Sequence, residues 1–306
     1  MFPLPSSSLA RSENGGFPPM PPEVFQRMME PVFLQLFDDL YLVGTRMISI
    51  LILKTSEGLV LIDSTDNPKA YEEYLEPGLA KFGLEKEKVL ALFLTHGHFD
   101  HYLGADGIRR NTGCEIGLSE EDAGYMIWSR ENVGPDQELK EGFVPRITFL
   151  VRDGETYTFG EHSILVMIGG GHTPGCLNFF FDVHENGERH RVMVGGGFGI
   201  FGPGHYADGG YPYGVQWSVD QALNYASSSV RAWEHVKETH CDVYFNPHPH
   251  LCDFEERMTA MENRGAGDPN PFVIGEEGVR KYIADRFRAA LDAAAQYTDI
   301  EKETAR

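Results

Sequence analysis

The stretch THGHFDH, residues 95–101, contains four side chains that can bind a metal ion. It directly follows VLALFLT (89–95), an apolar run with the length of a buried strand. The end of a strand gives the first of these side chains a defined position. The four candidate ligands are His96, His98, Asp100 and His101.

The spacing of these side chains predicts two metal positions. His96 and His98 are two residues apart, and side chains with this spacing point to the same side of an extended chain. Gly97 allows a tight turn, and Asp100 and His101 come after the chain has turned, so they can face a second ion. Neutral imidazole and carboxylate suit zinc, and they also suit iron or manganese.

One loop cannot enclose two ions, so further ligands should come from distant parts of the chain. GGGHTPG (169–175) places His172 at the end of a predicted strand. FNPHPHLCD (245–253) places His248 and His250 at the end of another, and prolines on both sides of His248 stiffen its backbone. The residues themselves leave the choice between His248 and His250 open.

The first half of the chain mixes strands and helices. ISILILKT (48–55) and LVLIDS (59–64) predict a hairpin of buried strands with its turn at Glu57 and Gly58. Residues 67–83 predict a helix that is interrupted near Pro77.

The second half repeats this mixture. Five strand-like segments between residues 147 and 195 predict a meander, and Ser218 with Gln221 forms a capping-box pattern before a long helix. A last helix is predicted near 276–296. Two such halves, each ending in a histidine-bearing loop, indicate a layered α/β architecture in which helices enclose a pair of sheets.

Composition and charge limit the partners. The net charge of −20 repels phosphate backbones and anionic lipid surfaces, so we expect a small-molecule substrate and neither nucleic acid nor membrane as partner. No apolar run reaches the length of about 20 residues that a membrane helix needs. The four cysteines form no C-x-x-C pair and predict free thiols in a reducing compartment.

The first residues differ in composition from the rest. Residues 1–31 are rich in Pro, Ser and Gly, and we predict an N-terminal arm there, followed by one domain over residues 32–306. The arm lacks a basic start followed by an apolar run, so a cytoplasmic location is expected. Its composition is also compatible with a homo-oligomer formed by exchange of arms.

Taken in order, LVLIDS, THGHFDH and GHTPG resemble the motifs of the metallo-β-lactamase superfamily, and the resemblance covers about residues 32–300. RDGETYTFG, CDVYFNPHP (241–249) and the tail EEGVRKYIADRF are similar to the third subclass of true metallo-β-lactamases. The resemblance implies an αββα four-layer sandwich with its site at one edge, between two sheets.

The resemblance also implies a set of ligands, and it favours His248 over His250. It assigns one ion to three histidines and a second ion to a carboxylate and two histidines: His96, His98 and His172 for the first, and Asp100, His101 and His248 for the second. Two Zn²⁺ ions per chain are expected, with iron or manganese as alternatives.

The expected activity is hydrolysis of a cyclic amide or ester, such as a β-lactam or a lactone, by metal-bound hydroxide. Asp100 would orient that hydroxide, and Asp63 at a strand end is a candidate partner for a ligand histidine. Alternatives are a mononuclear iron dioxygenase that oxidises sulfur, a thioester hydrolase, and a non-catalytic binding protein that keeps the fold.

The three glycines after the strand RVMVG depart from the resemblance, and the role of the glycine-rich loop that follows them is left open. Many relatives carry a bridging aspartate after the strand RVMVG, where this chain has Gly195, Gly196 and Gly197. We therefore expect a weaker second site and a less favourable case for thioester hydrolysis. GFGIFG (197–202) matches G-x-G-x-x-G, but the next residues cannot form the helix that a dinucleotide site requires. This loop is either a surface loop or a flank of the metal site that offers substrate contacts from His205, Tyr206, Tyr211 and Tyr213.

Overall fold

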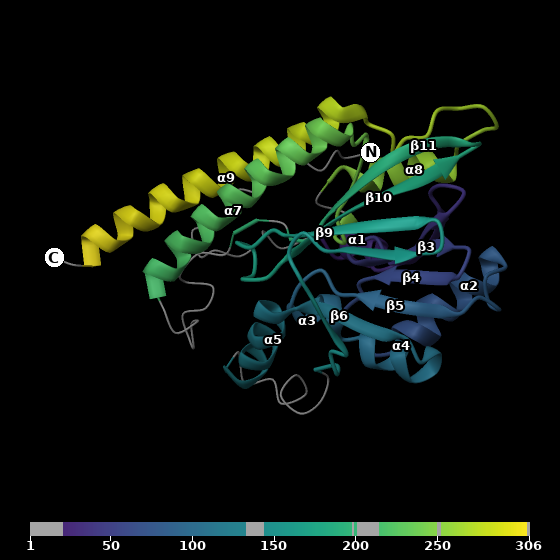
Figure 1. The fold of residues 1–306 in the computed structure, drawn as a ribbon, viewed down its shortest axis with the longest axis horizontal. Coiled ribbons are helices and arrows are strands. Elements are labelled where there is room, and N and C mark those ends of the chain that lie inside the picture. The colour runs from purple at the N-terminus through teal and green to yellow at the C-terminus, as the bar shows by residue number, and fades with distance from the viewer. Residues whose placement is uncertain (1–20, 133–143, 198, 201–213, 250–251, 305–306) are drawn as a thin grey trace.

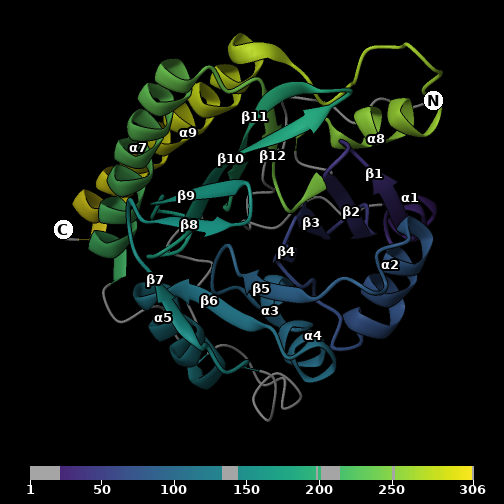
Figure 2. The same ribbon diagram turned by 45° about the vertical axis from the view of Figure 1, so that its right-hand side comes forward.

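Two β-sheets pack face to face, and helices cover their outer faces (Figure 1). The computed structural model describes residues 21–132, 144–197, 199–200, 214–249 and 252–304. Helices lie along the outer face of the first sheet, and two long helices run side by side over the second (Figure 2). The predicted αββα four-layer sandwich is confirmed.

The strands follow the chain in a simple order. The first sheet has the order β1-β2-β3-β4-β5-β6-β7 and the second has the order β12-β11-β10-β9-β8. The strands of the first sheet are β1 (Pro31–Gln35), β2 (Leu40–Thr45), β3 (Ser49–Thr55), β4 (Gly58–Ile62), β5 (Val89–Phe93), β6 (Glu115–Ser119) and β7 (Phe149–Val151). Those of the second are β8 (Thr156–Phe159), β9 (His162–Ile168), β10 (Leu177–Glu185), β11 (Glu188–Gly195) and β12 (Val243–Phe245).

The helices divide between the two outer layers. Those before β7 accompany the first sheet, while α7 and α9 accompany the second (Figure 1). Their bounds are α1 (Pro22–Met28), η1 (Tyr71–Leu75), α2 (Glu76–Phe82), α3 (Phe99–Tyr102), α4 (Ala105–Thr112), α5 (Glu120–Asn132), α7 (Gly214–Thr239), α8 (Phe254–Glu262) and α9 (Gly275–Thr304).

Alternate side chains of β3 enter two different hydrophobic layers. Leu51 and Leu53 belong to the core between the sheets, whereas Ile50 and Ile52 pack under the helices of the first sheet. This is the two-residue period of a strand that is buried on both faces. The predicted hairpin of β3 and β4 is confirmed, although the turn lies at Ser56 and Glu57 instead of Glu57 and Gly58, because Gly58 already pairs with Thr55.

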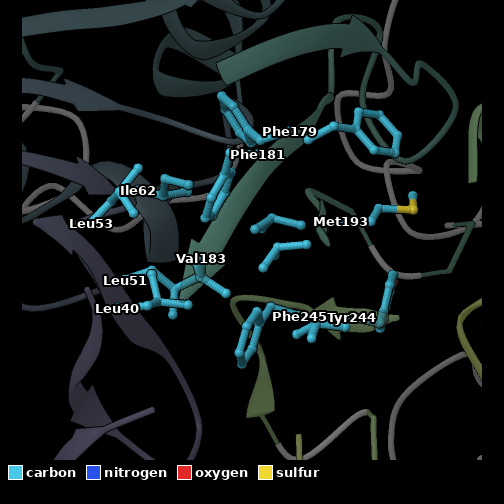
Figure 3. Packing of buried hydrophobic residues seen from close by; sticks show 14 of the residues in the cluster. Leu40, Leu51, Leu53, Ile62, Phe179, Phe181, Val183, Met193, Tyr244 and Phe245 are labelled. Atoms are coloured by element: carbon cyan, nitrogen blue, oxygen red, sulfur yellow. The ribbon is translucent and has the colours of Figure 1, made fainter. Parts of the chain in front are cut away.

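The second sheet is also covered on both faces. Phe179, Phe181 and Val183 of β10 point toward Leu51 and its neighbours in the first sheet (Figure 3). Phe180, between them in the sequence, contributes to the packing beneath α7, where its ring lies 4.4 Å from that of His235. Aromatic side chains therefore fill much of the space between the layers.

Several local expectations were wrong. The segment at Phe149–Val151 does not join the meander; it pairs parallel with β6 at the edge of the first sheet. Thr148 explains this position, because its hydroxyl accepts a hydrogen bond from the Ile116 amide at 2.7 Å. α7 begins at Gly214, before the capping pattern at Ser218, since no helix-breaking residue lies between these two positions.

The predicted arm includes a short helix. α1 begins at Pro22, where proline is tolerated because the first helical amide lacks an intrahelical partner. Met28 is fully buried, and Arg27 forms an ion pair with Glu255 of α8 at 2.8 Å. Residues 1–20 lie outside the described part of the chain.

The described helices include none that is long and apolar enough to cross a lipid bilayer. Cys114, Cys176, Cys241 and Cys252 are all buried free thiols, as their spacing predicted.

Phe93 of β5 is the aromatic residue that most directly joins the two sheets. It is fully buried and meets Phe149 of its own sheet and Tyr157 and Phe179 of the other, with ring centroids 5.2–5.7 Å apart. We expect Phe93→Ala to lower the free energy of unfolding by about 3–5 kcal/mol, because it leaves a cavity between the sheets. Urea denaturation measures this, with Leu150→Ala on the exposed edge strand as control. Equal losses in both variants would contradict the role of Phe93.

Candidate metal centre

The six predicted ligands converge at one edge of the sandwich, where strands from both sheets end. They form two groups in which the potential ligand atoms all lie within 4.8 Å of one another. The groups are His96, His98 and His172, and Asp100, His101 and His248.

Each ligand is positioned by the element that precedes it. His96 follows β5 directly, and His98 keeps an extended backbone before α3 begins at Phe99. The single turn of α3 then directs Asp100 and His101 toward the second group. His172 and His248 come after β9 and β12, both strands of the second sheet.

In the first group, hydrogen bonds decide which ring nitrogen faces inward. His172 Nδ1 donates to the carbonyl of Gly199 at 3.0 Å, so in the neutral ring Nε2 carries a lone pair. His96 Nδ1 lies 3.0 Å from the Thr95 hydroxyl, which donates its own proton to Asp63. Thr95 must therefore accept from His96, which leaves His96 Nε2 unprotonated as well.

The second group is fixed in the same way. His101 Nδ1 lies 2.6 Å from Asp63 Oδ2, and His248 Nδ1 donates to the Met47 carbonyl at 3.0 Å. In their neutral forms, both rings therefore carry a lone pair on Nε2. Asp100 Oδ2 lies 3.3 Å from His248 Nε2 and 3.6 Å from His101 Nε2.

These tautomers fit a cation in each group. His96 Nε2 and His172 Nε2 are 3.2 Å apart, and His101 Nε2 and His248 Nε2 are 3.1 Å apart. Two lone pairs that face each other across this distance repel unless a positive charge lies between them. Tetrahedral zinc with bonds of about 2.0–2.1 Å requires ligand atoms about 3.3 Å apart. The spacing and the donor set therefore fit Zn²⁺ or a similar cation.

Burial and mutual proximity also control the charges. Burial lowers the pKa of His96 and His172 well below the usual range, and neighbouring histidines lower it further. Burial acts to raise the pKa of Asp100, but His101 and His248 outweigh it and lower that pKa. For His101, burial acts to lower the pKa, and Asp100 and Asp63 together raise it.

Asp63 lies against one of the predicted ligand histidines, since its Oδ2 atom is 2.6 Å from His101 Nδ1. It is fully buried at the end of β4 and accepts hydrogen bonds from the amide and the hydroxyl of Thr95 at 2.7 and 2.8 Å. Its backbone has a φ of 64°, a conformation that costs energy in a residue with a side chain. The carboxylate of Asp63 connects His101 to Thr95 and, through the Thr95 hydroxyl, to His96.

Asp122 is an organising residue that the sequence reasoning missed. Its carboxylate accepts hydrogen bonds from the Gly97 amide at 2.8 Å, the Thr173 hydroxyl at 2.6 Å and the Gly175 amide at 2.6 Å. Burial raises its pKa to about 6. Asp122 thus connects the loop that carries His96 and His98 to the loop that carries His172. Its position after Ser119 resembles a helix start, so no sequence signal revealed this second role.

The sequence also did not identify the partner of His98. The Tyr125 hydroxyl of α5 lies 3.2 Å from His98 Nε2, while His98 Nδ1 lies 3.0 Å from His96 Nε2. His98 therefore offers its Nδ1 atom to the group, unlike the other histidines.

The three glycines after β11 are closely packed. A Cβ atom would lie 2.6 Å from the Tyr244 hydroxyl at Gly195, 2.1 Å from the Leu177 carbonyl oxygen at Gly196, and 2.4 Å from His172 Cβ at Gly197. A side chain at Gly196 would require a shift of the backbone, whereas one at Gly195 or Gly197 would require the Tyr244 or the His172 side chain to move. This edge of the site is therefore closely packed, and its three glycines supply no bridging carboxylate. His205, Tyr206, Tyr211, Tyr213 and His250 lie outside the described residues.

Comparison with known proteins agrees with this geometry. The family model for the metallo-beta-lactamase superfamily matches residues 43–185. Three similar solved structures are metallo-β-lactamases, with sequence identities of 18–22% and TM-scores of 0.66–0.69. BJP-1 of Bradyrhizobium japonicum, of subclass B3, shares 22% identity over 92% of this chain and 98% of its own, with a TM-score of 0.66. FEZ-1 of Legionella gormanii shares 21% over 91% and 99%, with a TM-score of 0.69. GOB-18 of Elizabethkingia meningoseptica shares 18% over 95% and 100%, with a TM-score of 0.68.

Curated relatives match a smaller part of the chain. A hydroxyacylglutathione hydrolase of Rhizobium johnstonii is 28% identical over 94 residues, which is 31% of this chain and 30% of that protein. The same enzyme of Brucella ovis is 27% identical over 120 residues, 39% of this chain and 38% of that protein. The chain thus matches about a third of the length of these relatives. The chain therefore matches the metallo-β-lactamase superfamily model over residues 43–185, slightly less than half of its length, and it shares the fold of the solved metallo-β-lactamases.

Proposed function

We propose that this protein is a dinuclear metal hydrolase that opens a cyclic amide or ester, with Zn²⁺ as the resident cation. The observation that supports this most directly is the pair of donor groups. Each group holds two histidine nitrogens whose lone pairs face each other at 3.1–3.2 Å. A binding protein without catalysis would not need two adjacent sets of this kind.

The bound cations would supply a water of lowered pKa as nucleophile and a positive charge that polarises the carbonyl group of the substrate. Asp100 completes the second group and remains ionised, since its pKa lies below the usual range. Its carboxylate can accept a hydrogen bond from the attacking water and so orient it toward the substrate. This is the role in which Asp100 acts as a catalytic residue.

Other side chains act by holding the ligands. Asp63 keeps the proton of His101 on Nδ1, and Tyr125 holds the ring of His98 through Nε2. Such partners fix ring orientation and raise the basicity of the ligand nitrogen.

The three glycines after β11 support the substrate class. Gly195, Gly196 and Gly197 supply no bridging carboxylate and are closely packed, which favours a lactamase-like or lactonase-like site over a thioesterase. The solved structures with this fold are named as β-lactamases. A thioester remains the second candidate, because the curated relatives are hydroxyacylglutathione hydrolases.

A mononuclear iron dioxygenase is less compatible with the site. One iron ion would need a single group of ligands, whereas Asp100, His101 and His248 form a complete second group beside the first. Metal analysis separates the two: two zinc ions at the metal centre support the hydrolase, and one iron ion supports the dioxygenase.

Removal of the metal should abolish hydrolysis. We expect treatment with EDTA to eliminate turnover and added Zn²⁺ to restore it. His98→Ala should lower kcat/KM by about 100-fold or more, because loss of a ligand removes several kcal/mol of transition-state stabilisation. His240→Ala is the matched control, since His240 is exposed and pairs only with Glu276 among the ion pairs of the described residues. Full activity after chelation would refute the proposal.

A substrate panel tests the bond that is cleaved. Nitrocefin, a series of lactones and an S-acyl glutathione thioester should be compared with the same enzyme preparation. We expect the highest kcat/KM for a lactam or a lactone, and a preference for the thioester would contradict the assignment.

Asp122→Asn tests the connection between the ligand loops. The amide of Asn would place N–H groups against donors that now face a carboxylate. We expect a loss of about 1–3 kcal/mol in the free energy of unfolding and a reduction of about 10–100-fold in zinc affinity. Competition with a chromophoric chelator measures the affinity. Glu121→Gln, at the neighbouring exposed position, should bind zinc like the wild type.

The two groups should respond differently to pH. Burial keeps His96 and His172 neutral, whereas the raised pKa of His101 means that a proton competes with the cation there at higher pH. Below that pKa, each unit of acidification should weaken the second group by up to about tenfold. His98→Ala leaves only the second group complete, and His248→Ala leaves only the first. Zinc titrations of both variants at pH 8, 7 and 6 should show the steeper decline in His98→Ala, and equal slopes would contradict this.

A further inference from the structure

A third group of metal-ligand side chains lies at the opposite end of the sandwich. Asp39, His162 and His184 bring one ligand atom each to within 4.8 Å of the others. His162 begins β9, whereas His172 follows the end of that strand. Since a strand of this length spans about 20 Å, this sheet-bridging cluster is separate from the metal centre.

The hydrogen bonds of His162 show the same feature as the ligand histidines. His162 is 2% exposed, and its Nδ1 donates to the carbonyl of Asp182 at 3.0 Å. A carbonyl oxygen can only accept, so in the neutral ring Nε2 carries a lone pair. That lone pair faces Asp39 Oδ2 at 3.4 Å and Glu161 Oε1 at 3.6 Å. The His162 ring is buried, whereas Asp39 and Glu161 reach solvent, and three acceptors that face one another beside a buried ring favour a cation between them.

The other two members complete the set. Asp39 Oδ1 accepts the backbone amide of His184 at 2.9 Å, which turns Oδ2 toward the two rings. His184 Nδ1 lies 2.7 Å from that Oδ2 atom. The 3.4 Å between His162 Nε2 and Asp39 Oδ2 matches the separation of about 3.3 Å that tetrahedral zinc requires of two ligands. The shorter contact of His184 Nδ1 with Asp39 Oδ2 is a hydrogen bond, and it would lengthen when an ion replaces its proton.

We propose that the sheet-bridging cluster is a structural site for a divalent transition-metal cation, with Zn²⁺ as the best match. His162 Nε2, His184 Nδ1 and Asp39 Oδ2 are the ligands, and Glu161 is close enough to supply a fourth. Binding displaces the proton from His184 Nδ1 to solvent. A carboxylate with two imidazoles is a normal donor set for zinc, whereas Ca²⁺ and Mg²⁺ prefer oxygen ligands.

The location indicates what such an ion does. Asp39 lies in the turn between β1 and β2 of the first sheet, and His162 and His184 belong to β9 and β10 of the second. The same turn is already attached by a backbone hydrogen bond from Asp38 to the His184 carbonyl at 2.8 Å. A cation here ties the two sheets together at the end remote from catalysis, so it stabilises the folded chain.

Metal counting on the purified full chain tests this site. After equilibration with excess Zn²⁺ and removal of unbound ion, His184→Gln and Asp39→Asn should each contain one zinc ion per chain fewer than the wild type. Gln at 184 keeps an amide that can donate to Asp39 but is a poor zinc ligand, so it separates metal binding from hydrogen bonding. His240→Gln is the matched control and should retain the wild-type count. An unchanged count in both cluster variants would overturn the proposal.

A second measurement separates this site from the metal centre. The double variant His98→Ala/His248→Ala, in which each ligand group of the metal centre lacks one member, should still bind one Zn²⁺. Adding His184→Gln to this double variant should abolish that binding. The rise in Tm caused by Zn²⁺ in the double variant should disappear with His184→Gln. If the double variant binds no zinc and shows no such rise, the cluster is not a metal site, whatever the metal centre binds.

Discussion

Oxygen atoms behind the histidine rings decide which imidazole nitrogens face the metal centre. The Gly199 carbonyl, the Met47 carbonyl and the Asp63 carboxylate each hold a proton on Nδ1 of one ring. The Nε2 lone pairs of these rings are therefore directed inward, where they repel one another. A cation would relieve that repulsion, so groups that do not contact the metal would contribute to its affinity.

That arrangement depends on how the two sheets meet. The ligand segments follow β5 in the first sheet and β9 and β12 in the second, so a shift of one sheet would separate the groups. The aromatic packing around Phe93 fixes the sheets against each other close to where β5 ends. Asp122 then holds the loops after β5 and β9 in register through three hydrogen bonds. The positions of the predicted ligands thus depend on the packing between the two sheets.

The features that could be predicted from the sequence are those with a local signal. The motif at residues 95–101 contains four donors in a short stretch, and the hairpin of β3 and β4 follows from alternating apolar residues. His248 was chosen over His250 only through a family resemblance, because both follow the same strand within three residues of one another and both are next to a proline. Asp122 was not found, since its three partners come from loops that are distant in the sequence. The position of β7 was missed for a similar reason: a strand pattern does not reveal which strand it pairs with.

The glycine run after β11 constrains how this protein can change during evolution. A single methyl group would collide with the Tyr244 hydroxyl at Gly195, with the Leu177 carbonyl at Gly196 and with the His172 side chain at Gly197. A point mutation to aspartate therefore disturbs its surroundings at every one of these positions. Conversion into a relative with a shared carboxylate between its cations would need compensating changes in the neighbouring residues, so one codon change does not suffice.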